Sequence, residues 1–133
     1  RTPVEHLEAT GLLGPWLTAI HANYAGTRDA LLLGKRGVSV VHCPRSHEYF
    51  GHEAFPLRRL SRAGVNVCLG TDSLASVLKS SQAPRHRPVL SMFQEMRTFS
   101  RRSPAREASF AREEMLRTAC KMKRFKARNR AQE

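Results

Sequence analysis

Three apolar segments of the chain each stop at a polar side chain. Residues 17–20 end at His21, residues 38–41 end at His42, and residues 65–69 are followed closely by Asp72. Short runs of this kind predict strands buried in a parallel sheet when helical patterns alternate with them. The carboxyl ends of parallel strands share one edge of the sheet, so we expect His21, His42 and Asp72 to converge there.

Helical patterns fill the segments around these strands. Apolar residues at helical spacing, with proline at a first turn and glycine after a last turn, predict helices over residues 3–11, 27–36, 55–63, 89–96 and 109–123. Thr27 is the expected cap of the second helix. Residues 43–47 and 73–88 are expected as loops, and a loop as long as the second one is usually functional.

This order of elements predicts an α/β fold with parallel strands. The chain has 133 residues, whereas a complete eight-stranded α/β barrel needs about 250. We therefore expect either a small open sheet with exposed edges or a piece of something larger.

The positive charge is concentrated toward the C-terminus. The formal net charge is +12, and residues 97–133 hold 12 of the 23 basic residues but 4 of the 11 acidic ones. Such a segment is typical of a solvated, partly disordered end, although it also fits a nucleic-acid-binding module. Few aromatic residues interleave with the charges, which argues against stacking on bases.

Cysteine usage favours a reducing compartment. Cys43, Cys68 and Cys120 are odd in number and none forms a C-x-x-C pair, so we expect a cytoplasmic protein with free thiols. No apolar run approaches the length of a membrane span, and the N-terminus has no secretory signal pattern, so no membrane partner is expected.

Four strings of residues, in this order, resemble the amidohydrolase superfamily. They are Ala-Ile-His-Ala at 19–22, His-Cys-Pro-Arg-Ser-His at 42–47, Ala-Gly-Val at 63–65 and Leu-Gly-Thr-Asp-Ser at 69–73. The branch is the one with cytosine deaminase-like, chlorohydrolase-like and adenosine-derivative deaminase enzymes. The resemblance extends over residues 1–119, including the helical segment Phe-Gln-Glu-Met-Arg at 93–97. It implies a TIM-type (β/α)₈ barrel, of which this chain holds about the last three β/α units, strands 6 to 8. Residues 120–133 are then a basic, frayed tail.

The resemblance also implies roles for individual side chains. Asp72 is expected to bind a metal ion and to carry a proton from the attacking water to the leaving group, while His21 stabilises the attacking oxygen. His42, His47 and Ser73 are expected to face the substrate, a small purine-like or other cyclic molecule that loses ammonia. The implied cofactor is a divalent metal, with Zn²⁺ favoured over Fe or Mn.

The chain departs from the family pattern in its metal ligands. The family's His-x-His motif occurs nowhere in the sequence, and a catalytic zinc ion needs about three protein ligands. His6 is better explained as a surface residue of the first helix than as a substitute ligand. We therefore expect the isolated chain to be inactive, and a truncated fragment without a biochemical role of its own remains an alternative.

Overall fold

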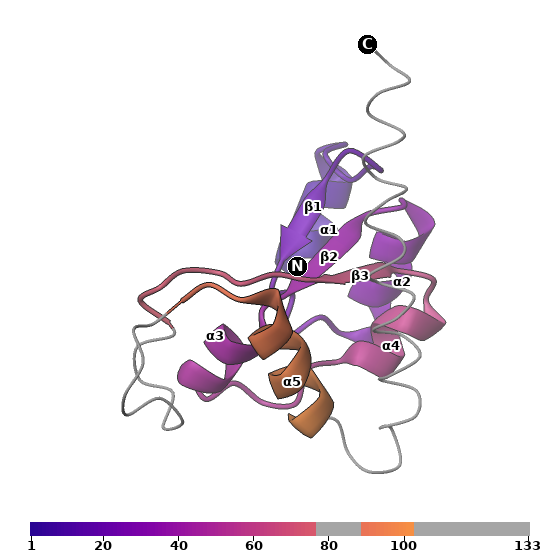
Figure 1. Ribbon diagram of the computed structural model, residues 1–133. Helices are drawn as coiled ribbons and strands as arrows, with labels where there is room; N and C mark the ends of the chain where they lie inside the picture. The colour runs from indigo at the N-terminus through magenta and orange to yellow at the C-terminus, as the bar shows by residue number, and fades with distance from the viewer. Residues whose placement is uncertain (77–88, 103–133) are drawn as a thin grey trace, which may run out of the picture.

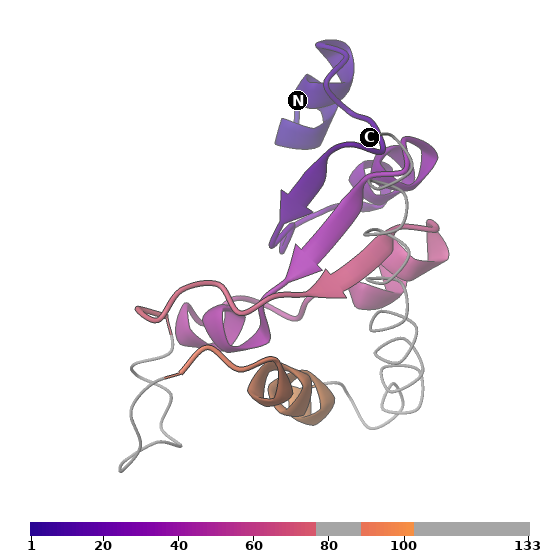
Figure 2. The same cartoon turned by 45° about the horizontal axis from the view of Figure 1, so that its top comes forward.

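The computed structural model of the chain describes residues 1–76 and 89–102 (Figure 1). Within these residues β1 (Thr18–Ile20), β2 (Ser39–His42) and β3 (Asn66–Leu69) form one parallel sheet in the order β1-β2-β3. Both outer strands pair with β2, so that Ala19 lies opposite Val40 and Val40 lies opposite Val67. The three strands run in the same direction, and their carboxyl ends therefore form one edge (Figure 2).

Helices alternate with the strands, as expected for βα units. The described helices are α1 (Pro3–Ala9), α2 (Thr27–Lys35), α3 (Pro44–Tyr49), α4 (Leu57–Arg62) and α5 (Met92–Arg102). None of the helices in these parts of the chain is both long enough and apolar enough to cross a membrane. The expected α/β class with parallel strands is confirmed, while the numbering of the strands as 6 to 8 of a barrel stays a prediction.

The core lies between the sheet and the helices α2 and α4. It is built from the side chains that alternate toward the helices along the strands and from the inner faces of the two helices, among them Ala30, Leu33, Val40, Leu60 and Val67. The residues between them in β2 and β3 are only partly buried, and β1 is exposed at both ends. Among the described residues β2 and β3 are thus fully buried on one face only, and no residue of β1 is fully buried, in contrast to the burial on both faces that their composition indicates.

Three local predictions are wrong. The helix expected at 89–96 is α5, which begins three residues later, at Met92, and continues to Arg102. Residues 44–49 form helix α3 where a loop is expected, and Pro44 occupies its first turn, a position that tolerates proline because no backbone N–H is needed there. The cap of α2 is Gly26 rather than Thr27, and its amide donates to the Asp29 carboxylate at 3.1 Å. The expected helix at 109–123, the basic tail at 120–133 and most of the loop at 73–88 lie outside the described residues.

Gly34 allows α2 and α4 to approach closely. A Cβ atom built on Gly34 would lie 1.8 Å from the backbone oxygen of Ala63, at the end of α4. Backbone atoms cannot give way as the end of a flexible side chain can. The distance between the two helices that cover the sheet therefore depends on this glycine.

We expect Gly34→Ala to destabilise the fold by about 1–3 kcal/mol, the cost of overpacking a filled core. In an unobstructed helix interior the same change would stabilise by about 0.5–1 kcal/mol. Gly26→Ala is the matched control, because its added Cβ meets only the Asp29 carboxylate at 3.7 Å. Urea unfolding measures both variants, and a Gly34→Ala chain as stable as the wild type would contradict this packing.

Candidate active site

The segments that follow the strands carry unusual backbone conformations. His21, Ala22 and Asp72 have φ angles of 69°, 45° and 53°, and they are the non-glycine residues with positive φ in the described parts of the chain. Such conformations are costly for residues with a Cβ and are often found at functional sites. Hydrogen bonds between neighbouring segments continue past the strand ends, since the His21 amide donates to the Val41 carbonyl at 2.8 Å.

His21 and Asp72 face each other at the carboxyl edge of the sheet. The Nε2 atom of His21 lies 3.8 Å from Oδ2 of Asp72, and their side chains are 38% and 28% exposed. The pair is therefore partly shielded but still open to a small molecule. A histidine and a carboxylate at this separation can share protons with a molecule bound between or above them.

A third side chain completes this contact. The Ser46 hydroxyl, in the first turns of α3, donates a hydrogen bond of 2.5 Å to Oδ2 of Asp72. The backbone amide of Asp72 donates in turn to the thiol of Cys43. Burial raises the pKa of that thiol to about 11, so Cys43 is a neutral packing residue at pH 7. We call His21, Ser46 and Asp72 the rim cluster.

Helix α5 holds the start of α3 through a buried ion pair. Arg45 and Glu95 are 6% and 0% exposed, and the Arg45 guanidinium and backbone amide each donate to the Glu95 carboxylate. The same guanidinium donates to the side-chain oxygen of Gln94 and to the backbone oxygen of Val89. Each guanidinium nitrogen of Arg45 and each carboxylate oxygen of Glu95 thus has a hydrogen-bond partner, as buried charged groups require.

Sequence reasoning missed Ser46, Arg45 and Glu95 as parts of the site. All three stand in strings that carry the family resemblance, at 42–47 and 93–97. Their location in these strings was the only sequence signal for the three residues, and it does not show which side chain each of them contacts. Arg45 and Glu95 are 50 residues apart in the chain, and only the folded structure brings them together.

His42 does not join the rim cluster as predicted, because its side chain lies on the buried side of β2. Its ring stacks on Phe55 with centroids 3.9 Å apart, meets His47 edge to face at 5.0 Å, and leaves Nδ1 buried with no hydrogen-bond partner among the described residues. Burial, and to a lesser extent the nearby His47 and His21, lower the pKa of His42 to about 3. His42 is therefore neutral at physiological pH.

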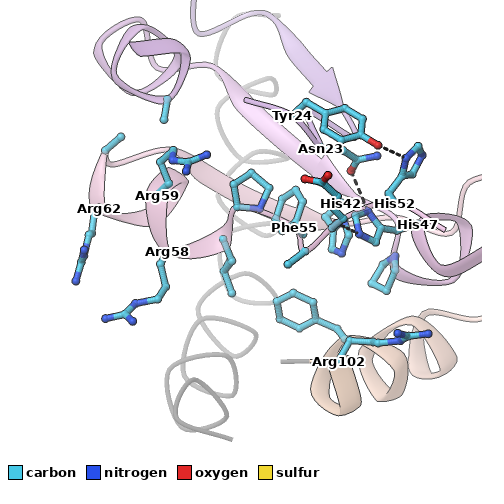
Figure 3. A pocket seen from close by; sticks show the side chains of 18 of the residues that line it. Asn23, Tyr24, His42, His47, His52, Phe55, Arg58, Arg59, Arg62 and Arg102 are labelled. Carbon is cyan, nitrogen blue, oxygen red and sulfur yellow. Dashed lines mark hydrogen bonds between the residues drawn. The ribbon is translucent and has the colours of Figure 1, made fainter. Parts of the chain in front are cut away.

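His47 and His42 line a lateral groove between α2, α4 and α5 (Figure 3). This groove does not include His21 or Asp72. The two ring nitrogens of His47 face the Asn23 side chain at 3.1 Å and the Glu53 carbonyl at 2.7 Å. In this structure the rings of His42 and His47 contact Phe55 and Glu53 in the segment that follows α3. Contact of either histidine with a substrate stays a prediction. Ser73 is exposed beside Asp72, and its predicted contact with substrate is likewise untested.

The described residues do not fit a metal ion by themselves. No group of three or more His, Cys, Asp or Glu side chains in these parts of the chain is arranged to hold one. Asp72 and His21 supply at most two ligands, fewer than a stable zinc site uses. Any metal site that includes Asp72 needs ligands from beyond the described residues.

The depressed pKa of His42 predicts a pH dependence of stability. The unfolded chain binds a proton at His42 near pH 6.5, whereas the folded chain does so only near pH 3. The free energy of unfolding should therefore fall as the pH drops through this window, by at most about 1.4 kcal/mol per pH unit from this group. Urea unfolding of the wild type and His42→Gln between pH 7 and pH 4 measures the difference.

His42→Gln should show a shallower pH slope than the wild type, because its side chain does not titrate. His6→Gln is the control, since His6 lies exposed on α1. Equal slopes in His42→Gln and the wild type would contradict the burial of a neutral His42.

Comparison with known proteins identifies the family. The profile of the Amidohydrolase family matches residues 1–122. The 5-methylthioadenosine/S-adenosylhomocysteine deaminase of Syntrophobacter fumaroxidans is 51% identical over 76 residues, which are 57% of this chain and 17% of that protein. The 5'-deoxyadenosine deaminase of Methanothermobacter thermautotrophicus is 39% identical over 99 residues, 74% of this chain and 21% of that protein.

Solved structures agree with this assignment. An adenosine deaminase from Xanthomonas campestris with bound zinc superimposes with a TM-score of 0.64 and 34% identity, covering 77% of this chain and 21% of that one. A triazine hydrolase matches with a TM-score of 0.54 and 26% identity over 57% of this chain and 17% of its own. The chain spans only 17% to 21% of the length of these proteins. These matches confirm the resemblance to the adenosine-derivative deaminase branch, and the chain belongs to the Amidohydrolase family.

Proposed function

We propose that this chain contributes part of the active site of a hydrolytic deaminase that removes the amino group of an adenosine derivative. The observation that carries the proposal is the 3.8 Å approach of His21 to Asp72 at the carboxyl edge of the sheet, where α/β barrels hold their catalytic side chains. The relatives named as deaminases of 5-methylthioadenosine and 5'-deoxyadenosine support the choice of reaction and substrate.

Hydrolytic deamination needs two proton movements that this pair can serve. The oxygen of water bonds to the ring carbon that bears the amino group, the electron pair of its C=N double bond moves onto the adjacent ring nitrogen, and the carbon becomes tetrahedral. Asp72 accepts the proton that the water loses and returns it to the amino nitrogen. The electron pair on the ring nitrogen then re-forms the double bond as the bond to the amino nitrogen breaks and ammonia leaves. His21 donates a hydrogen bond to the oxygen of the attacking water and stabilises the charge that develops on it.

The proposal includes a divalent cation bound in part by Asp72. The zinc in the adenosine deaminase from Xanthomonas campestris supports this ion. In the proposal the remaining ligands come from beyond the described residues, because Asp72 and His21 alone provide too few. For the same reason we expect the isolated chain to release no ammonia from adenosine derivatives.

A chimera tests the proposal. This chain replaces the matching segment of the 5'-deoxyadenosine deaminase of Methanothermobacter thermautotrophicus, and ammonia release from 5'-deoxyadenosine is measured. Asp72→Asn in the chimera should lower kcat by about 10²- to 10⁴-fold, the usual contribution of a positioned acid–base group.

Glu48→Gln is the matched control, because it makes the same change of carboxylate to amide at a surface residue paired with Arg102. It should keep the activity of the chimera within about twofold, since exposed ion pairs contribute little. A chimera that is active with Asp72→Asn, or that deaminates no adenosine derivative, would overturn the proposal.

A further inference from the structure

The carboxylate of Asp72 needs an external support to hold its direction. Asp72 lies beyond the end of β3, in a backbone conformation with φ of 53°, and no strand ladder fixes it there. The Ser46 hydroxyl reaches it from α3 with a hydrogen bond of 2.5 Å. Ser46 is 1% exposed, so water competes poorly for its hydroxyl, while the Asp72 side chain is 28% exposed and stays open to a bound molecule.

The hydrogen bond falls on the same oxygen that faces His21. Ser46 Oγ and His21 Nε2 both approach Oδ2 of Asp72, at 2.5 and 3.8 Å. An ionised carboxylate can only accept, so the serine supplies the proton of this bond. A bond from a buried donor to one chosen oxygen fixes the rotation of the side chain, and it turns Asp72 toward His21.

Ser46 is itself held from outside its own helix. The neighbouring Arg45 is tied to α5 by its backbone amide, 2.9 Å from Glu95 Oε2, and by its guanidinium. Pro44, Arg45 and Ser46 are all buried. The first turn of α3 therefore has little freedom to shift, and the Ser46 hydroxyl is presented to Asp72 from a fixed position.

We propose that Ser46 is a positioning residue, which holds the Asp72 carboxylate in the orientation that faces His21, and that the Arg45–Glu95 pair fixes Ser46 for this task. Its value for catalysis rests on the proposed deaminase function. The orientation itself is a property of this chain alone, and it can be measured without activity.

The test measures the χ1 angle of Asp72 in the full chain by NMR, from the couplings between its α and β protons. In the wild type we expect couplings that fit a single staggered rotamer, either one large and one small or two small. In Ser46→Ala we expect averaged couplings of intermediate size, because the hydrogen bond is lost. Ser46→Thr keeps the hydroxyl and should restore the single rotamer.

Ser61→Ala is the matched control, since it removes another serine hydroxyl, one that is buried without a partner among the described residues. It should leave the Asp72 couplings unchanged. A single Asp72 rotamer in Ser46→Ala, or averaged couplings in the wild type, would overturn the proposal. If Ser46→Ala does not fold, Ser46→Cys takes its place, because a thiol has a similar size but is only a weak donor, and a single Asp72 rotamer in that variant would overturn the proposal.

Activity of the chimera separates this proposal from the proposed function. Ser46→Ala should lower kcat about tenfold or more, as expected for the loss of a hydrogen bond to a charged group, and should leave KM within about twofold. An inactive chimera with the expected Asp72 couplings would refute the deaminase function and leave the positioning role intact. An active chimera with unaltered kcat in Ser46→Ala would refute the role of Ser46 in catalysis.

Discussion

The buried ion pair between Arg45 and Glu95 is the contact on which the arrangement of the rim cluster depends. It joins the helix after β2 to a helix that follows β3, so two segments that share no strand pairing are tied to each other. A charge left in the interior without its partner is costly, commonly by about 3–5 kcal/mol. The pair therefore specifies one arrangement of α3 and α5, and Ser46 and Asp72 meet within that arrangement.

The sheet and the ion pair have different roles at the carboxyl edge of the strands: one sets position and the other sets orientation. Parallel pairing brings the ends of all three strands to one side, which delivers His21 and Asp72 to the same place but leaves their side chains free to turn. The side-chain contacts behind them remove that freedom. In the proposed reaction the Asp72 carboxylate benefits from such support, because misplacement by a fraction of an ångström weakens proton transfer. The sheet thus determines where the site lies, and the contacts of α3 and α5 determine how it is oriented.

Sequence patterns were sufficient to predict where the strands lie and that His21 and Asp72 meet. Both follow from local apolar runs and from the geometry of parallel sheets. They did not give helix α3, since the proline that ends a strand also fits the first turn of a helix. They predicted that His42 converges with His21 and Asp72, whereas alternation along β2 turns its ring toward Phe55 and the helices. The Ser46 and Glu95 contacts span 26 and 50 residues, and no local pattern encodes such distances.

Hydrogen exchange at the Arg45 amide tests the central claim most directly, because this amide donates to Glu95 rather than to a helix or strand partner. We expect strong protection in the wild-type chain. In Glu95→Ala the protection should be lost at Arg45 while the amides of β2 and β3 that pair within the sheet keep theirs. Rapid exchange of the Arg45 amide in the wild type, or equal protection in Glu95→Ala, would contradict the account.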